Sequence, residues 1–350
     1  MGSLVILFAL LSLIGVCKAD PGCPGLDTYY WGYWGANLTE TSAPDIIWDT
    51  EDANQLTLAY NNNKAVLFKL QNLLFDFDGP TNMFSAKSNW ANLIDTNYGN
   101  YSNPTNPYSI SGLYANSPNG FFIGSNLMWY GLEPSKLYTI ANYLRAKYPT
   151  ALIAIDEHFS LYYNGRNFHN EDYVFWVYNP INILSISHYW PDGVDGVPDG
   201  TTTSNNIYYE YKDFILPSLK DDVKMVWSIA MYDTSPTYME SSCHPPSGED
   251  CAFVMKNRTA EFFQMMCRDR ANCDEADPLP NYIHSDRIRG IWAWHWDNRP
   301  NTVGYETGLR SIPELHGYEF YFGTLACDLN PASIVSLSAY TLLLVLFLFI

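Results

Sequence analysis

Short, almost wholly apolar runs alternate along the chain with segments in which apolar residues recur at helical spacing. The run Ala151–Ile155 (ALIAI) has no polar position, which is typical of a strand buried on both faces. The segment Ser135–Lys147 follows Pro134, a residue favoured in the first turn of a helix, and places its apolar side chains on one face. The pattern therefore predicts an α/β fold in which strands and helices alternate.

The predicted strands are Tyr29–Trp34, Lys64–Leu70, Gly120–Ile123, Ala151–Ile155, Ile181–Ser187, Val223–Ala230 and Ile288–Trp296. The predicted helices lie near Glu51–Asn61, at Ser135–Lys147, near Tyr208–Leu219 and at Arg258–Arg268. One further strand around Asp45–Trp48 would complete the set that closes a (β/α)8 TIM barrel, which we expect to form a single domain. The rival architecture is an open doubly wound sheet, but no glycine-rich phosphate loop follows any predicted strand. Two segments rich in Asn, Gly, Ser and Pro are predicted as long loops, Phe75–Ser117 and Asp192–Asn206.

Composition excludes some classes of protein and some classes of ligand. Of the 350 residues, 47% are hydrophobic and 16% are charged, which excludes a disordered or fibrous chain. The 19 basic and 37 acidic residues give a net charge of -18, and a field of this sign repels nucleic acids and anionic lipids. Aromatic residues make up 16% of the chain, so a neutral polar ligand such as carbohydrate is the best match.

Both ends of the chain are apolar. Residues 1–19 predict a secretory signal peptide, because an apolar stretch leads to a small residue, Ala19, at the expected cleavage point. Residues 331–350 end in YTLLLVLFLFI, which indicates either a GPI-attachment signal or a short membrane anchor. Residues 20–330 would then form an extracellular domain that is tethered to the cell surface.

Cysteine usage agrees with an oxidising compartment. Removal of Cys17 with the signal leaves an even set, namely Cys23, Cys243, Cys251, Cys267, Cys273 and Cys327. Local spacing favours the pairs 243–251 and 267–273 and leaves the first and last cysteines to join the termini. A zinc site is the rival interpretation, but no C-x-x-C pair is present. Glycosylation sequons at Asn37, Asn100 and Asn257 also agree with secretion.

Four predicted strands end in carboxylates or histidines, and in a barrel these ends meet at one face. The polar ends are Asp156-Glu157-His158, His188-Tyr189-Trp190, Tyr232-Asp233 and His295-Trp296-Asp297. The candidate catalytic residues are Glu157, Asp156, Asp297 and Asp233, although acidic residues at strand ends also cap helices, which is the better interpretation of Asp233. Strand alternation must point either Asp156 or Glu157 into the barrel mouth.

Aromatic and polar residues at the same ends are candidates for stacking on a sugar ring or for hydrogen bonding to it. The candidate substrate-binding residues are Trp31, Trp34, Asn126, His158, His188, Tyr189, Trp190, Tyr232, Trp294, His295 and Trp296. Each of the tryptophans has a plainer interpretation, since Trp also fills barrel cores.

The runs YYWGYW, IDEH, ISHYWPDG and GIWAWHWDN, in this order between Thr28 and Gly323, resemble secreted glycoside-hydrolase-like (β/α)8 barrels. The resemblance implies a groove for carbohydrate and two carboxylates that flank the bond to be cut. Many such barrels carry an Asp-Glu or Asn-Glu pair at the end of the fourth strand. If Gly120–Asn126 is the fourth strand, Ser125 and Asn126 stand at that position and Glu133 follows only in the loop, so that Asp156 or Glu157 must substitute from the next strand or the protein only binds. If the count is off by one strand, IDEH is itself the acid-bearing position.

Three hypotheses follow. The first is a surface-tethered glycosidase for a neutral or amino-sugar polymer, in which Glu157 is the acid/base, Asp156 orients it, and Asp297 or Asp233 is the partner. The second is an inactive barrel of the same kind that binds carbohydrate. The third is a metal-dependent hydrolase using three histidines with Asp297, which ranks last because no H-x-H or H-E-x-x-H motif is present. We expect a monomer with no cofactor and no metal.

Overall fold

The computed structural model describes residues 30–34, 45–48, 50–62, 65–103, 109–110, 119–173, 175–187, 211–220, 223–230, 232–234, 287–294, 299–300 and 305–308. All seven cysteines, the two apolar ends and the helix expected at Arg258–Arg268 lie outside these ranges. None of the helices in the described ranges is long and apolar enough to cross a membrane.

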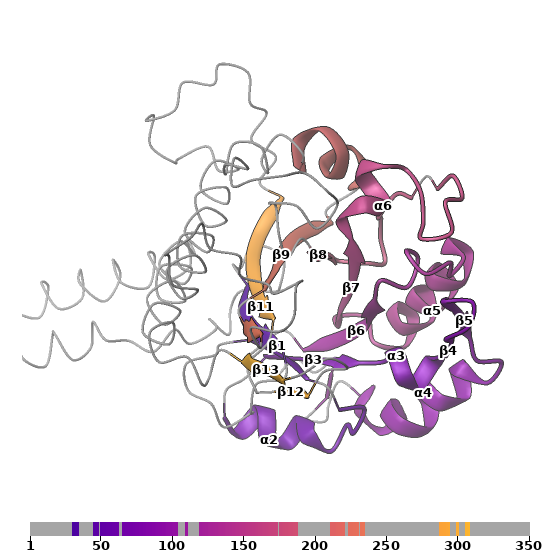
Figure 1. Cartoon of the computed structure of the whole chain (residues 1–350). Helices are drawn as coiled ribbons and strands as arrows, with labels where there is room; N and C mark the ends of the chain where they lie inside the picture. The colour runs from indigo at the N-terminus through magenta and orange to yellow at the C-terminus, as the bar shows by residue number, and fades with distance from the viewer. Residues whose placement is uncertain are drawn as a thin grey trace, which may run out of the picture.

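Eight parallel strands form a closed barrel (Figure 1). In chain order they are β1 (Tyr30–Trp34), β2 (Asp45–Trp48), β3 (Ala65–Lys69), β6 (Gly120–Ser125), β7 (Leu152–His158), β8 (Ile183–Ser187), β9 (Lys224–Ala230) and β11 (Ile288–Trp294). Neighbours run β1-β11-β9-β8-β7-β6-β3-β2, and β1 also pairs with β2, which completes the circuit. The prediction of a parallel sheet is confirmed, including the strand at Asp45–Trp48. β6 is the fourth strand of the barrel, as expected.

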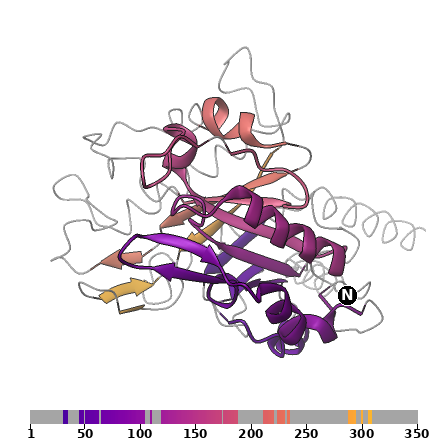
Figure 2. The same cartoon turned by 90° about the vertical axis from the view of Figure 1, so that its right-hand side faces the viewer.

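Helices and shorter strands occupy the connections between barrel strands. The helices are α2 (Gln55–Asn61), α3 (Gln71–Leu74), α4 (Trp90–Tyr98), α5 (Pro134–Lys147) and α6 (Phe159–Tyr163), with the single turns η1 (Gly99–Tyr101), η2 (Tyr211–Ile215) and η3 (Leu216–Ser218). The shorter strands are β4 (Phe75–Asp78) and β5 (Met83–Ala86), which form a hairpin, and β10 (Tyr232–Thr234), β12 (Arg299–Pro300) and β13 (Tyr305–Gly308), which form a small antiparallel sheet. Figure 2 shows α5 lying against the outside of the barrel strands.

Two expectations about the connections were wrong. The predicted loop Phe75–Ser117 contains the β4–β5 hairpin and α4, because Ile94 and Tyr98, one helical turn apart, are both buried against the barrel. Tyr98 packs on Phe68 and Phe121, with ring centroids 5.6 and 5.3 Å apart. The helix expected near Tyr208–Leu219 is, where described, only the turns η2 and η3, since Pro217 interrupts the hydrogen bonding.

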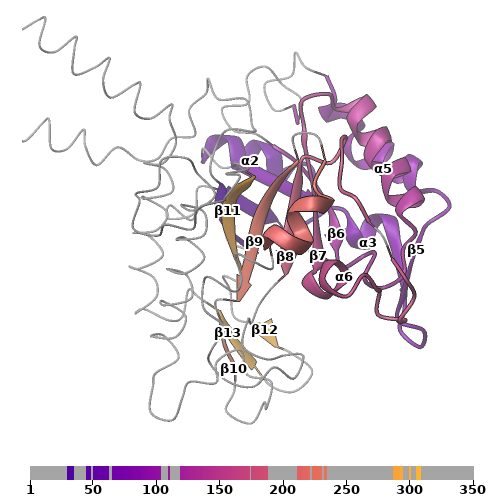
Figure 3. The same cartoon turned by 90° about the horizontal axis from the view of Figure 1, so that it is seen from above.

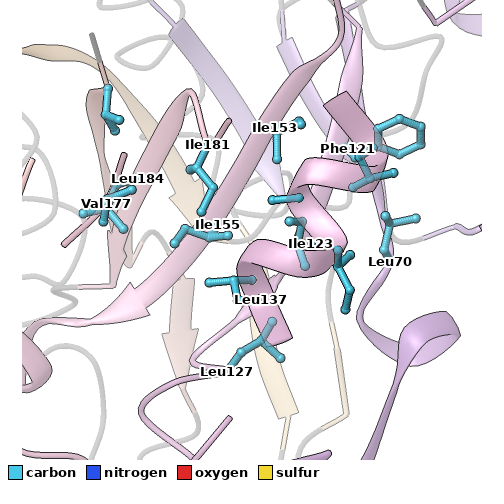
Figure 4. Close-up of a cluster of buried hydrophobic side chains, with 14 of the residues drawn as sticks. Leu70, Phe121, Ile123, Leu127, Leu137, Ile153, Ile155, Val177, Ile181 and Leu184 are labelled. Atoms are coloured by element: carbon cyan, nitrogen blue, oxygen red, sulfur yellow. The ribbon is translucent and has the colours of Figure 1, made fainter. Parts of the chain in front are cut away.

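The core has two layers. Inside the barrel lie Trp34, Leu67, Phe122, Leu152, Ala154, Ile183, Val226 and Trp292. Between the strands and the helices lies the larger cluster, in which Leu137 of α5 meets Ile123 and Ile155 of the strands (Figure 4). Successive residues of β7 alternate between these two layers, and this alternation fixes the direction of every side chain at its end.

The strands β6 and β7 approach each other closely at Gly120. A Cβ atom at this position would lie 2.0 Å from the carbonyl oxygen of Leu152 in β7, so backbone would have to move. We expect Gly120→Ala to destabilise the fold by about 3 kcal/mol, the cost of overpacking a rigid site. Gly124→Ala is the matched control, because its Cβ would meet the movable side chain of Leu127 at 2.9 Å and should cost about 1 kcal/mol. Urea denaturation of both variants measures the difference, and equal costs would contradict this explanation.

Candidate functional site at the end of the fifth barrel strand

The alternation of β7 points Asp156 into the barrel and Glu157 away from it. Leu152 and Ala154 belong to the inner cluster, whereas Ile153 and Ile155 belong to the outer one. Asp156 continues the inner series and Glu157 the outer series. The expectation that one of the two carboxylates enters the barrel is met by Asp156.

Asp156 is buried, with 1% of its surface exposed, and is held by the end of β6. The Ser125 hydroxyl donates a hydrogen bond to its Oδ2 at 2.5 Å, and the Asn126 amide donates to its backbone carbonyl at 2.7 Å. Asn126 takes a left-handed backbone conformation (φ 55°), which asparagine tolerates better than most residues. Asn126 therefore forms the corner of a turn that joins the end of β6 to β7, next to the residue whose hydroxyl holds the carboxylate.

The inner face of the barrel carries further polar side chains. Ser185 pairs with Asp156 in the barrel register, and both Ser185 and Ser228 are fully buried. The Trp34 indole donates a hydrogen bond to Ser228 Oγ at 3.3 Å. Ser185 Oγ and Trp292 Nε1 have no hydrogen-bond partner among the described residues. Unpaired buried polar atoms are costly, so the inner face near Asp156 is suited to a bound polar group.

The position of Glu157 differs from the prediction, which made this residue the acid in the barrel mouth. It is fully buried in the outer layer, where its two carboxylate oxygens accept hydrogen bonds from the amides of Met128 and Trp129 at 3.0 and 3.2 Å. Burial, together with the nearby charge of Asp156, raises the pKa of Glu157 to about 8 despite the opposing effect of these amides. The physical reason for this position is strand alternation, which turns its side chain away from Asp156. Glu157 secures the turn after β6.

His158 lies at the rim of the barrel. Its ring stacks on that of Trp129, with 4.7 Å between the ring centroids and 22° between the ring planes. Its Nδ1 accepts a hydrogen bond from the Ser160 amide at the start of α6. Trp129 was not among the predicted site residues. The signal that could have found it is the pair Trp129-Tyr130, two aromatic residues directly after the polar end of a strand.

The remaining predicted residues fall into three groups. Trp34 is 1% exposed and packs edge-to-face on Phe122 and Trp292 inside the barrel, so its expected role as an exposed stacking face was wrong. Four residues are described by their backbone position in β1, β10 and β11, namely Trp31, Tyr232, Asp233 and Trp294. Six lie outside the described residues, namely His188, Tyr189, Trp190, His295, Trp296 and Asp297.

Two further features bear on the chemistry. Within the described ranges, no group of three His, Cys, Asp or Glu side chains is placed to hold a metal ion. A shallow hollow of about 240 Å³ lies on the flank of the barrel, lined by Pro134, Ser135, Tyr138, Phe175, Trp176 and Tyr178. This hollow belongs to α5 and the segment before β8, away from Asp156.

Comparison with solved structures identifies the architecture. A β-D-glucuronidase of Dictyoglomus thermophilum matches with a TM-score of 0.50 and 10% identity over 81% of this chain and 47% of that one. The fold that the two proteins share is the TIM barrel. At this identity the likeness shows the TIM barrel alone, and the chain spans about half of the glucuronidase.

Two further solved structures have lower TM-scores. A GH113 β-1,4-mannanase has a TM-score of 0.42 and 12% identity, with 85% of this chain and 99% of that chain covered. Xylanase 10B of Thermotoga maritima has a TM-score of 0.45 and 8% identity, with 89% and 99% covered. No family model and no curated protein sequence matches the chain.

Proposed function

We propose that the chain is an extracellular glycoside hydrolase that cuts a neutral or amino-sugar polymer, with Asp156 as one of its two carboxylates. The observation that carries the proposal is the inward-facing Asp156 at the carboxyl end of a barrel strand, the position where TIM barrels place their chemistry. Unpaired buried polar atoms on the same inner face support a polar ligand. The net charge of -18 disfavours an acidic polysaccharide.

The surroundings of Asp156 favour the role of nucleophile or general base. A charge-assisted hydrogen bond from Ser125 stabilises an ionised carboxylate and fixes its orientation. Glycoside hydrolysis then needs a second carboxyl group that protonates the leaving oxygen. Asp297 and Asp233, at or after the ends of later strands, are our candidates for that group. The aromatic pair of Trp129 and His158 at the rim would stack on a sugar ring.

The location of the enzyme is part of the proposal and rests on the sequence. The apolar start would direct the chain into the secretory pathway, and the apolar end would attach it to the membrane as a GPI signal or a short anchor. We therefore place the barrel on the outer surface of the cell, where extracellular polysaccharide is the accessible substrate.

A second function has its own support. Ser125 and Asn126 stand at the end of the fourth strand, and neither side chain exchanges a proton at neutral pH. Glu157, the other carboxylate of β7, secures a turn in the outer layer. These two facts favour a barrel that binds carbohydrate without cutting it.

Release of reducing ends separates the two functions. The full chain, purified from a eukaryotic host, would be incubated with xylan, mannan, hydroxyethylcellulose and glycol chitosan beside its Asp156→Asn variant. Release by the parent that is lost in the variant supports the hydrolase. Binding to one of these polymers without release by either protein supports the binding barrel and overturns the hydrolase.

A further inference from the structure

Five aromatic residues form a continuous strip across three connections of the barrel: Phe77, Phe84, Trp129, Tyr130 and Phe168. Phe77 lies 4.8 Å from Phe84 and 5.7 Å from Tyr130, measured between ring centroids. Phe168 lies 5.4 Å from Tyr130 and 6.2 Å from Trp129. Each ring of this aromatic strip therefore touches the next, from the hairpin to the segment after α6.

Backbone hydrogen bonds hold the three connections together. The Phe84 amide donates to the Tyr130 carbonyl at 3.0 Å, and the Phe168 amide donates to the Trp129 carbonyl at 2.9 Å. The His169 Nε2 atom lies 3.2 Å from the Asn82 carbonyl and links the third connection to the hairpin. The rings are thus fixed before a ligand arrives, which lowers the entropy cost of binding.

The aromatic strip is exposed at its outer part. Phe77 and Phe168 each expose 48% of their surface, and Met83 of the same hairpin is exposed as well. Single exposed apolar residues need no explanation, but contiguous ones on a charged protein mark an interaction surface. No core requirement explains these two phenylalanines, since neither belongs to the buried clusters.

The inner end of the aromatic strip reaches the barrel mouth. Trp129 stacks on His158, and His158 follows Asp156 by two residues on the inner face of β7. The hairpin follows β3, the Trp129 turn follows β6 and Phe168 follows α6, so all three connections lie at the carboxyl ends of the strands. Figure 3 shows α6 and the turn of the hairpin at the same end of the molecule as the arrowheads of β8 and β9.

Charge around the aromatic strip is acidic. The hairpin carries Asp76 and Asp78, and Glu171 and Asp172 follow Phe168. Among the described residues, two of these carboxylates form ion pairs, Asp76 with Lys87 at 3.9 Å and Asp172 with Arg166 at 3.2 Å. An acidic polymer would be repelled here, whereas sugar hydroxyl or ammonium groups would find acceptors beside the rings.

We infer that the aromatic strip binds the chain of a neutral or cationic polysaccharide and leads it from the outer surface to Asp156. The inference rests on the proposed function for the identity of the ligand class, and it adds the surface along which several sugar units of that polymer bind outside the barrel mouth. Aromatic rings present an apolar face that matches the face of a pyranose, and their edges leave the hydroxyl groups hydrated.

Affinity electrophoresis of the full chain tests the inference. All proteins would carry Asp156→Asn, so that the polymer in the gel is not hydrolysed during the measurement. Gels would contain hydroxyethylcellulose, mannan, xylan or glycol chitosan, with carboxymethylcellulose as the acidic probe. Phe77→Ala combined with Phe168→Ala should weaken retardation by about tenfold, and Phe77→Trp should preserve it. Trp176→Ala is the matched control, because it removes a still more exposed ring (56%) from the flank and should have no effect.

Three outcomes would overturn the inference: no retardation of the Asp156→Asn protein by any polymer, retardation that is equal in the double variant, or stronger retardation by carboxymethylcellulose. Concentration-dependent self-association that the double variant abolishes would show that the aromatic strip is instead an interface between copies of the chain. Failure of this inference can be told apart from failure of the proposed hydrolase function. Retardation that depends on the aromatic strip can persist even where the parent protein releases no reducing ends.

Discussion

Asp156→Asn should lower kcat/KM for polysaccharide hydrolysis by at least about a hundredfold while leaving the fold intact, because a positioned acid or base contributes about 10²–10⁴ in rate. Asparagine keeps the shape of the side chain, and its amide oxygen can still accept the hydrogen bond from Ser125. It cannot accept a proton or attack a sugar carbon. Reducing-end release measures the rate, and urea denaturation of the same preparation verifies folding.

Two further variants make this result specific. Ser125→Ala removes the hydrogen bond that orients Asp156 and should lower the rate by about tenfold, the cost of one charge-assisted hydrogen bond. Glu157→Gln changes a carboxylate on the opposite face of the same strand. Loss of hydrolysis in Glu157→Gln, together with normal rates in Asp156→Asn, would return the acid/base role to Glu157 and contradict our assignment.

Glu157 should make the protein less stable as the pH rises from 5 to 8. Its pKa is raised from 4.5 to about 8 in the folded state, so over this interval the unfolded chain releases a proton that the folded chain keeps. The contribution is fully present below pH 4.5 and is lost as the pH approaches 8. We expect the free energy of unfolding to fall by about 3 kcal/mol more in the parent than in Glu157→Gln, which has no proton to release.

Chemical denaturation at pH 5 and pH 8 measures this difference. Glutamine accepts only one of the two amide hydrogen bonds, so Glu157→Gln should be about 1 kcal/mol less stable than the parent at pH 5. The order of stability should then reverse at pH 8. Glu133→Gln, at an exposed position before α5, is the control and should follow the parent at both values. A parallel decline in the parent and Glu157→Gln would contradict the raised pKa.

The barrel strands could be predicted because they are buried on both faces. A wholly apolar run such as Ala151–Ile155 marks a strand without any need for alternation. For the same reason, the direction of the residues that follow could not be predicted. The run carries no polar position that would reveal which face is which, so the sequence leaves open whether Asp156 or Glu157 turns inward.

The connections were harder to predict than the barrel. The hairpin 75–86 and α4 lie in a segment whose asparagine, glycine and serine content is typical of loops. Their regular secondary structure depends on packing against the barrel, which the local sequence does not reveal. Trp34 is of a residue type that often stacks on sugars, but it packs inside the barrel on Phe122 and Trp292 instead. Trp129 and Phe168 are far apart in the sequence, and only the fold brings them together.

The aromatic strip and Asp156 stand on different parts of the scaffold. The rings are carried by connections, whereas the carboxylate is carried by a barrel strand. Insertion or exchange of residues 75–86 would therefore alter Phe77 and Phe84 of the aromatic strip and leave the sequence of every barrel strand unchanged. Natural variants could acquire a new polymer preference by changing this hairpin while they keep β7 and Asp156 unchanged, and a laboratory library confined to these twelve positions would explore the same space.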